Sequence, residues 1–369
     1  MSTNRGLESL LEAIRLLTDD PAPDRRHVAL AVVPSSGHHD PAHPEHAGRV
    51  IAAFRALLND DLVGNPRSGC FHLHDFAPAD VDAIARVHET AYIDALRLAV
   101  SRAPAVIDAA PTYITPTSFD DACRAAGAAI AAVDAVLDGR ARSAFALARP
   151  PGHHARPAAA MGFCLLGNVA VAARHAQARG IGRVLIVDFD VHHGNGTQEI
   201  FEADDSVVFL SSHQRGAYPG TGAIDEVGAG AGRGATVNVP LPPGAGDAAF
   251  ARVFADVVAP LAERVRPELV LVSAGFDASF RDPLADLAVT GEGFHAIARA
   301  LADIAARHAE GRIAFVLEGG YDLPALGDGV ANVVRALVGR AAATALGGPG
   351  RAEPSVDGVI DRVRRVHGL

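Results

Sequence analysis

The stretch RVLIVDFDVHHGNGTQ at residues 183–198 constrains the fold of this chain most strongly. Its apolar, β-branched run predicts a buried parallel strand, which leads directly into Asp188, Asp190 and His192. Because side chains alternate along an extended chain, these three residues share one face. We therefore expect carboxylates and an imidazole at the carboxyl end of a central strand, where open α/β sheets build binding sites. This donor set suits zinc or iron.

A structural alternative is that these side chains only cap the turn that follows. It is disfavoured because four ionisable residues within six positions, Asp188, Asp190, His192 and His193, would be costly to bury directly after a core strand without a bound partner.

Composition limits the classes of protein to which the chain can belong. Its 369 residues are 49% hydrophobic and carry a formal net charge of -10, which disfavours binding to nucleic acid or to an anionic membrane. The apolar runs fall short of the ~18 residues that cross a bilayer. Acidic residues interrupt the apolar pattern of residues 1–17, so we expect an amphipathic helix there and no signal peptide. Three scattered cysteines argue against a disulfide scaffold and for a cytoplasmic protein.

Strand and helix patterns alternate along the chain, as they do in proteins with a parallel sheet covered by helices. A chain of 369 residues can form one large α/β domain or two ordinary ones, and we expect a central, mostly parallel β-sheet flanked by helices on both faces. Taken as one domain, the sheet and its helices are expected over 27–340, with an N-terminal helical extension at 1–26 and a C-terminal helical tail at 341–369 that packs on it. The strands are expected at 27–33, 144–148, 184–187, 206–213, 236–241, 268–278 and 312–323.

Further candidate residues follow other predicted strands. Two prolines and a glycine fix the backbone before His153 and His154, an adjacent pair suited to acid and base work. Asp282, in an Asp-Pro turn, is a candidate third metal ligand, since two protein ligands rarely hold a catalytic zinc. Tyr321, after paired glycines, can donate a hydrogen bond from the tip of a loop.

Two other segments invite a functional interpretation that we do not favour. The histidine-rich loop at 35–49 could bind a metal, but prolines interrupt it, and we expect a structured loop beside a pocket. The glycine-rich loop at 215–234 lacks the GK[ST] signature and the following helix of a phosphate-binding loop. Cys164 is expected to pack in the interior.

Seven motifs, in order, give the chain a clear resemblance. They are HPE…R at 43–49, RPPGHHA at 149–155, MGFCLLGN at 161–168, DFDVHHGNGTQ at 188–198, YPGTG at 218–222, AGFDA…DPLA at 274–285 and LEGGY at 317–321. The chain resembles zinc-dependent deacetylases of the histone deacetylase and acetylpolyamine amidohydrolase superfamily, which implies the arginase/deacetylase-like fold. The motif sequences RPPGHHA and HHGNG are similar to those of the class II and bacterial branch of this superfamily.

The resemblance implies a role for each matching residue. It makes Asp190, His192 and Asp282 the ligands of one Zn2+ per chain, with Fe2+ as an alternative ion. It makes His154 the general base and acid and His153 its electrostatic partner, and it places Tyr321 at the oxyanion. Further implied catalytic residues are Asp188, which would hold His153, and Asn195, which stands beside His154 where some relatives carry an aspartate.

The resemblance also implies sites around this centre. A structural K+ would be bound by residues at two strand ends, namely Asp188, Asp190, His192, Ser211 and Ser212. An acyl-lysine channel would be lined by Phe163, Tyr218, Gly162 and Val289. Arg49 would sit near an exit for acetate.

The function expected from these residues is removal of acetyl or another short acyl group from an amine such as N-acetyl-lysine. Within the same chemistry, the substrate could instead be an N-acetylpolyamine or a small acylated metabolite. Two interpretations from other classes stay open at this point: an inactive module that binds acylated ligands, and an arginase-like ureohydrolase with two manganese ions. The sequence does not settle whether the chain forms a homo-oligomer.

Overall fold

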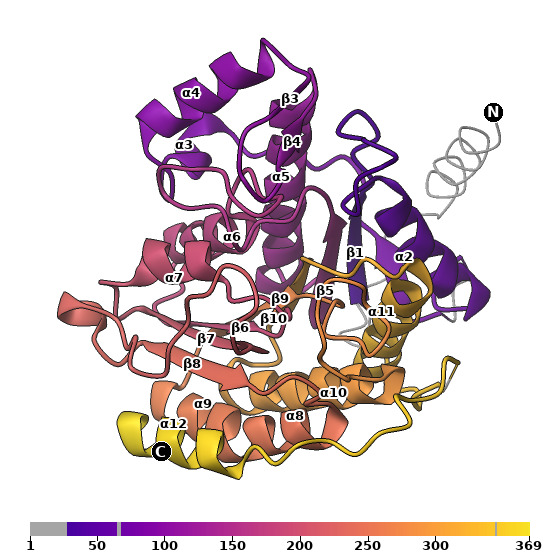
Figure 1. Cartoon of the computed structure of the whole chain (residues 1–369). Coiled ribbons are helices and arrows are strands. Elements are labelled where there is room, and N and C mark those ends of the chain that lie inside the picture. Colours follow the sequence, from indigo (N-terminus) through magenta and orange to yellow (C-terminus); the bar gives the residue numbers. More distant parts are fainter. Residues whose placement is uncertain (1–27, 65–67, 344) are drawn as a thin grey trace.

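An eight-stranded parallel sheet forms the centre of the molecule (Figure 1). The computed structural model describes residues 28–64, 68–343 and 345–369, so the helix expected over 1–26 lies outside the described residues. The strand order is β2-β1-β5-β10-β9-β6-β7-β8, and every described strand pair in this sheet is parallel. The strands are β1 (Val28–Val33), β2 (Cys70–His72), β5 (Ser143–Ala148), β6 (Val184–Asp188), β7 (Val207–Gln214), β8 (Thr236–Leu241), β9 (Leu269–Ala274) and β10 (Ile313–Leu317).

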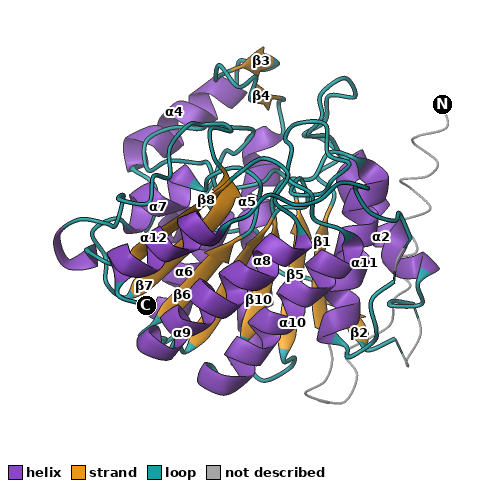
Figure 2. Ribbon diagram, turned by 60° about the horizontal axis from the view of Figure 1, so that its bottom comes forward, coloured by secondary structure: helices purple, strands orange, loops and turns teal. Residues whose placement is uncertain are grey.

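Helices cover both faces of the sheet (Figure 2), so the predicted three-layer α/β architecture is confirmed. Alternate residues of β1 point to opposite cores: Val28 and Leu30 join one hydrophobic cluster, and Ala29 and Ala31 join the other. One layer contains α2 (Gly48–Asn59), α8 (Asp247–Val253), α9 (Ala259–Val265), α10 (Gly291–His308), α11 (Leu323–Leu337) and α12 (Asp357–His367). The opposite layer contains α3 (Val81–Ile84), α4 (Thr90–Val100), α5 (Ser118–Leu137), α6 (Asn168–Ala178) and α7 (Asn195–Phe201).

Local sequence explains where the helices nearest the site begin and how they pack. Asp322 caps α11 by accepting a hydrogen bond from the amide of Ala325, and Pro324 occupies the first turn, where its missing N–H costs nothing. In α5, fifteen of the twenty residues are buried, and most of these are alanines that allow close approach to β1, β5 and α6. These helices hold the strand ends in fixed positions.

Some elements differ from the sequence-based prediction. The helix expected over 81–96 is interrupted between Ile84 and Thr90, where the imidazole Nε2 of His88 accepts a hydrogen bond from the amide of Gly167. The loop expected over 103–118 contains a small hairpin of β3 (Ala105–Val106) and β4 (Tyr113–Ile114). Between α8 and α9, the segment Phe254–Val258 is a π-helix.

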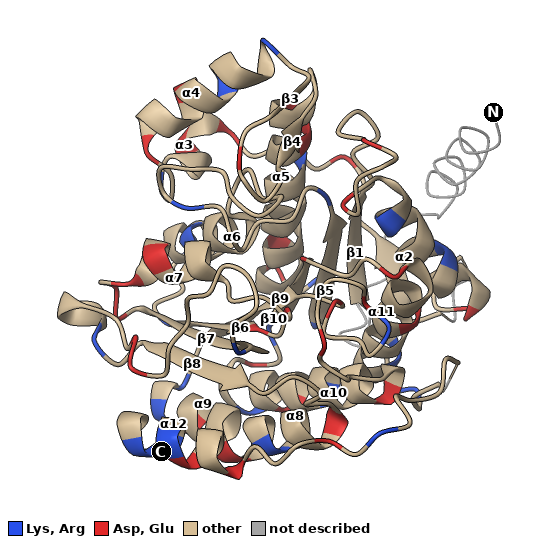
Figure 3. Ribbon diagram, viewed as in Figure 1, with Lys and Arg blue, Asp and Glu red and all other residues tan. Residues whose placement is uncertain are grey.

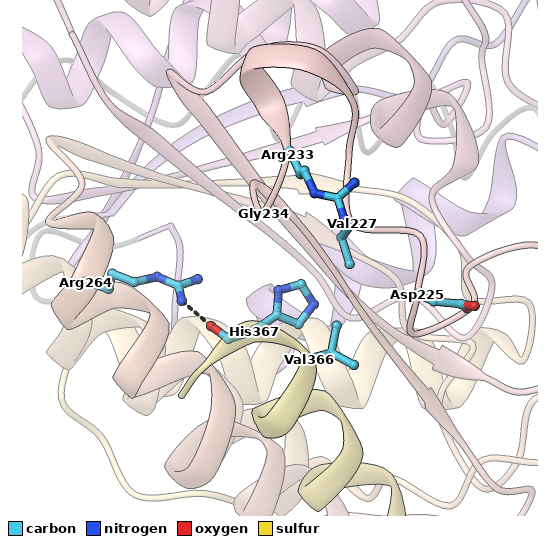
Figure 4. Close-up of a pocket in the computed structure, with 7 residues that line it drawn as sticks. All are labelled: Asp225, Val227, Arg233, Gly234, Arg264, Val366 and His367. Atoms are coloured by element: carbon cyan, nitrogen blue, oxygen red, sulfur yellow. Dashed lines mark hydrogen bonds between the residues drawn. The ribbon is translucent and has the colours of Figure 1, made fainter.

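The C-terminal helix α12 packs along β8 at the edge of the sheet and buries Ile360 and Val363 in the core. It closes one side of a cavity of about 640 Å3, shown in Figure 4. There the Nη1 of Arg264 donates a hydrogen bond to the carbonyl oxygen of His367 at 2.5 Å. None of the predicted site residues lines this cavity.

Charged residues lie mainly on the peripheral helices and loops, where acidic and basic residues are interspersed (Figure 3). Among the described helices, none combines the length and apolar character needed to cross a bilayer. Within the part of the chain that the structure describes, the buried Asp, Glu and Arg residues are Glu45, Arg49, Asp121, Arg149, Asp188, Asp190, Asp277, Asp282 and Glu318.

Candidate metal and catalytic site

The four central strands, in the order β5-β10-β9-β6, end beside one another, and each is followed by a polar loop. Residues 149–155 follow β5, Asp190 and His192 follow β6, residues 275–282 follow β9, and residues 318–322 follow β10. Parallel strands end at the same edge of a sheet, so segments that are far apart in the sequence meet here.

One group of three side chains at this edge can hold a metal ion. Ligand atoms of Asp190, His192 and Asp277 all lie within 4.8 Å of one another. The Nδ1 of His192 is 3.1 Å from Oδ1 of Asp190 and 3.2 Å from Oδ2 of Asp277. Both carboxylates are fully buried, so their oxygens face the imidazole without competition from solvent.

The structure adds a candidate for the third ligand: Asp277 lies in this group, whereas Asp282 lies outside it and stays a prediction. Both oxygens of Asp282 accept hydrogen bonds from backbone amides. Its Oδ2 accepts hydrogen bonds from the amides of Tyr321 and Asp322, and its Oδ1 accepts one from the amide of Leu284. Asp277 comes three residues after β9 ends at Ala274, inside a segment predicted as strand. The signal that could have found it is its place in the motif AGFDA.

The donor set fits a divalent cation. Asp190 and Asp277 in the group, and Asp188 and Glu318 near it, are four fully buried carboxylates, and they raise the pKa values of His153 and His192. Burial raises the pKa of Asp188 to about 6 despite its contact with His153. Burial alone would lower the pKa of His192, but hydrogen bonds to Asp190 and Asp277 raise it to about 10. Two carboxylates and one imidazole match the three protein ligands of catalytic zinc sites.

The tandem histidines are held in different ways. The Nδ1 of His153 is 3.0 Å from the Asp188 carboxylate, and the Asp190 and Asp188 charges outweigh burial and raise the pKa of His153 well above its usual value. The Nδ1 of His154 is 2.7 Å from Oδ1 of Asn195. Burial, together with the nearby His153 and His192, lowers the pKa of His154 well below its usual value. His154 is therefore the neutral member of the pair, able to accept a proton.

Tyr321 lies on a loop packed against the metal-binding group. The amide of Gly319 donates a hydrogen bond to Oδ2 of Asp190 at 2.8 Å, and a Cβ on Gly319 would lie 1.9 Å from Oδ2 of Asp277, so only glycine fits. Gly320 has φ +120°, a conformation that side chains disfavour. Burial raises the pKa of Tyr321 well above its usual value, so its hydroxyl stays a donor.

Arg49 is fully buried and braces the same loop from the other side. Its Nε donates to the carbonyl oxygen of Gly320 at 2.7 Å, its Nη2 donates to that of Glu318 at 2.5 Å, and its guanidinium carbon lies 4.8 Å from the centre of the Tyr321 ring. A role for Arg49 at an acetate exit stays a prediction.

Among the residues predicted to bind K+, Asp188 ends β6, and Ser211 and Ser212 lie within the neighbouring strand β7. Asp188 and Ser211 are paired in register, and the hydroxyl of Ser212 donates to the carbonyl oxygen of Asp188 at 3.3 Å. The hydroxyl of Ser211 is 2.9 Å from Nδ1 of His213.

Three of the four residues predicted for a substrate channel lie next to the catalytic side chains. The rings of Phe163 and Tyr321 meet edge to face with their centres 5.9 Å apart, and the rings of Tyr218 and His154 meet in the same way with their centres 5.1 Å apart. Gly162 packs so closely on His154 that a Cβ would lie 2.4 Å from its ring. Val289 is the exception and corrects the prediction. It is 0% exposed, and its amide donates to the carbonyl oxygen of Ala278, so it belongs to the core.

Sequence reasoning missed the side chains that hold this channel segment. The Oδ2 of Asp108 accepts a hydrogen bond from the amide of Gly162, and the hydroxyl of Thr112 accepts one from the amide of Phe163, both at 2.9 Å. Both Gly162 and Phe163 have positive φ, so the segment needs such support. The chain between β3 and β4, read from the sequence as a surface loop, gave no signal for this role.

Sequence reasoning also missed how the histidine-rich loop is held. Glu45, fully buried, forms ion pairs with Arg149 and with Arg49 at 3.3 Å. The Nδ1 of His38 is 2.6 Å from the hydroxyl of Ser118, and the rings of His38 and Tyr113 stack at 4.4 Å. Among the described residues, the group that could hold a metal ion includes no histidine of this loop.

Comparison with known proteins identifies the family to which this chain belongs. The model of the histone deacetylase domain matches residues 43–337. The chain belongs to the histone deacetylase family. It is 46% identical over 325 residues to "Histone deacetylase 10, chloroplastic" of Oryza sativa subsp. japonica, covering 85% of this chain and 73% of that protein. It is 45% identical over 234 residues to "Polyamine deacetylase HDAC10" of Homo sapiens, covering 62% of this chain and 34% of that protein.

A solved structure supports the same family assignment. The crystal structure of the HDA15 HD domain superposes with a TM-score of 0.83 at 35% identity, covering 92% of this chain and 95% of that one. The expected superfamily and fold are thus confirmed, and the chain is a deacetylase, a hydrolase that acts on acylated substrates. This membership favours neither the ureohydrolase nor the inactive binding module. Placement in a class II-like bacterial branch and a cytoplasmic location stay predictions, since the rice relative is named chloroplastic.

Proposed function

We propose that this histone deacetylase-family enzyme removes acetyl or another short acyl group from N-acetyl-lysine or a similar acylated amine, using one zinc ion held by Asp190, His192 and a third carboxylate, either Asp282 or Asp277. The observation that carries the proposal is the convergence of this metal-binding group with the His153–His154 pair and Tyr321 at one edge of the sheet. A bound zinc ion would polarise the amide carbonyl and lower the pKa of a water molecule from ~15.7 toward ~7.

The protein's own residues supply the proton transfers. Because the Nδ1–H of the neutral His154 ring donates to Asn195, its Nε2 keeps a free lone pair that can take a proton from the attacking water. Asn195 orients the ring without adding negative charge, so the pKa of His154 stays low. After attack, His154 returns this proton to the departing amine, which makes loss of the amine productive.

The developing oxyanion needs a donor, and Tyr321 can provide one. Its hydroxyl remains protonated because burial raises its pKa, and its loop is fixed by contacts to Asp190 and Arg49. A donor held in place before reaction stabilises the transition state without a cost of reorganisation. Phe163 and Tyr218, which lie beside Tyr321 and His154, would line the apolar stem of the substrate.

We further propose the K+ site predicted from the resemblance, with ligands from Asp188, Asp190, His192, Ser211 and Ser212. The neighbouring positions of Asp188 and Ser211 in the sheet support it. It predicts a higher melting temperature in KCl than in NaCl of equal ionic strength, and equal melting temperatures would contradict it.

The main proposal is tested by release of acetate from an acetyl-lysine peptide. Chelation should abolish the release and one equivalent of zinc should restore it, while Tyr321→Phe, which lacks one hydroxyl, serves as the matched low-activity control. Full activity in a metal-free preparation would overturn the zinc mechanism. Reconstitution with iron in parallel decides between the two ions.

A polyamine is the second candidate substrate, because one relative is named a polyamine deacetylase. The loop after β9 presents an uncharged, 42% exposed Leu284, which favours the acetyl-lysine peptide. Turnover of acetylputrescine above that of the peptide would reverse this preference.

A further inference from the structure

The cavity beside the C-terminal helix is built from three parts of the chain. Its volume is about 640 Å3, within the range of small-molecule sites. Arg264 comes from α9, Val366 and His367 come from the end of α12, and the rest of the lining comes from residues 225–234, at the end of the glycine-rich loop. In Figure 4 the side chains of Arg264 and His367 lie on one side of the cavity, and that of Arg233 lies on the other. A ligand held here would therefore join elements that are distant in the sequence.

The wall of the cavity carries more positive than negative charge. Arg233 and Arg264 contribute two guanidinium groups, and Asp225 contributes one carboxylate. Among the described residues, neither guanidinium forms an ion pair, and Arg264 donates to a backbone carbonyl oxygen, that of His367. A guanidinium presents N–H donors in a planar fork that matches the oxygens of phosphates and carboxylates. The charge and the donors of the wall favour an anion.

The imidazole of His367 adds a buried polar group without a partner. The residue is 8% exposed, and its Nε2 has no hydrogen-bond partner in the part of the chain that the structure describes. Burial and the Arg264 charge lower the pKa of His367, so its ring is neutral at pH 7 and carries one N–H. A buried polar group that stays unpaired costs free energy. With the proton on Nε2, an oxygen of a bound anion would supply the missing acceptor.

The remaining lining fits a ligand with an organic body and not a bare ion. Val366 is 43% exposed, and together with Val227 it offers apolar contact to the carbon atoms of a ligand. The carboxylate of Asp225 repels a second negative group but can accept a hydrogen bond from a hydroxyl. Both features indicate a molecule that is anionic at one end and hydroxylated elsewhere.

We propose that this cavity binds the phosphate monoester of a small hydroxylated molecule, with Arg233, Arg264 and His367 donating to the phosphate and Asp225 accepting from a hydroxyl. The site is separate from the metal and catalytic residues, and the proposal does not rest on the proposed deacetylation. Because such a ligand binds the folded protein and joins α9, α12 and the end of the glycine-rich loop, it stabilises the folded state.

Calorimetric titration of the full chain tests the proposal, with glucose 6-phosphate as the probe. Inorganic phosphate and glucose should each bind at least about tenfold more weakly than the probe. Arg233→Gln and Arg264→Gln should each raise the Kd of the probe by about 10- to 100-fold, because each removes charged hydrogen bonds. Arg365→Gln is the matched control: it removes the same charge from the last turn of α12, outside the cavity lining, and should leave the Kd unchanged.

Thermal melts of the same samples give a second measurement. With the probe at about 100-fold its Kd, the Tm of wild type should rise by about 5 °C, and that of Arg233→Gln by less than about half as much. His367→Phe keeps an aromatic ring and removes both nitrogens, so it should also weaken binding, and it replaces Arg264→Gln if that variant folds poorly.

Three results would overturn the proposal. Wild type that does not bind glucose 6-phosphate at millimolar concentration would exclude the site. Inorganic phosphate that binds as tightly as the probe would exclude a role for the organic body. Arg365→Gln that weakens binding as much as Arg233→Gln would show that the net charge of this face, and not the cavity, attracts the anion.

Discussion

The choice between Asp277 and Asp282 as the third metal ligand gives a sharp prediction. Asp277→Asn removes a fully buried carboxylate whose Oδ2 lies 3.2 Å from Nδ1 of His192 and leaves two protein ligands. Loss of a group that merely supports a ligand typically costs about 10- to 100-fold in metal affinity, so loss of the ligand itself should cost more than ~100-fold. Asp282→Asn changes a carboxylate that accepts hydrogen bonds from backbone amides. If Asp277 is the third ligand, this substitution should weaken zinc binding by no more than about 100-fold.

The effect on stability follows from linkage. At free zinc 100-fold above its Kd, binding stabilises the folded protein by about 2.7 kcal/mol. At about 2 °C per kcal/mol for a large domain, chelation should lower the Tm of wild type by about 5 °C. Asp282→Asn should keep this difference between zinc-loaded and chelated samples. In Asp277→Asn, zinc-loaded and chelated samples should have the same Tm. The zinc-free variant should be no less stable than zinc-free wild type, because burial and the Asp190 charge raise the pKa of Asp277 and make its charged form costly.

The assay is metal content by inductively coupled plasma mass spectrometry after dialysis at fixed free zinc, with thermal melts of the same samples. One zinc per chain in Asp277→Asn together with loss of zinc in Asp282→Asn would refute the assignment drawn from the geometry.

Three further predictions concern catalysis and stability. Asn195→Asp puts a carboxylate beside the Nδ1 of His154 and should raise the pKa of that histidine, because a negative charge stabilises the protonated ring. Since a general base must be unprotonated, the acidic limb of kcat/KM should move to higher pH, and an unmoved profile would count against His154 as the base. His153→Ala should reduce kcat more than His153→Gln, because glutamine can still donate to Asp188, and equal losses would argue against that role. Leu271→Ala, in the centre of β9, should lower the free energy of unfolding by about 2–5 kcal/mol without changing zinc content, as measured by denaturant titration.

The parts of the site that the sequence predicts are those set by local periodicity. The alternation of an extended chain is enough to put Asp190 and His192 on one face, and the structure brings them together. Asp277 was not predicted as a site residue because the predicted strand 268–278 included it. In the structure, β9 ends at Ala274 and the chain then turns toward the site. No strand-length argument locates that end, since it depends on the neighbouring strands.

The errors at Val289 and in the helix over 81–96 have a tertiary origin. Val289 follows a turn that suggests a loop at a site, yet its amide pairs with Ala278 and its side chain fills the core. The helical pattern around His88 is regular, but a contact with Gly167, seventy-nine residues away, coincides with the break in the helix. Such distant partners leave no trace in a local pattern.

The carboxylate of Asp190 is shared between two structures that are usually discussed apart. Its Oδ1 faces His192 in the metal-binding group, and its Oδ2 accepts the amide of Gly319 on the loop that carries Tyr321. Occupancy of the metal site and order in this loop are therefore thermodynamically coupled, and such coupling is reciprocal. A ligand that engages the Tyr321 hydroxyl should slow dissociation of the metal, and stripping the metal should loosen the tyrosine before it affects the rest of the sheet.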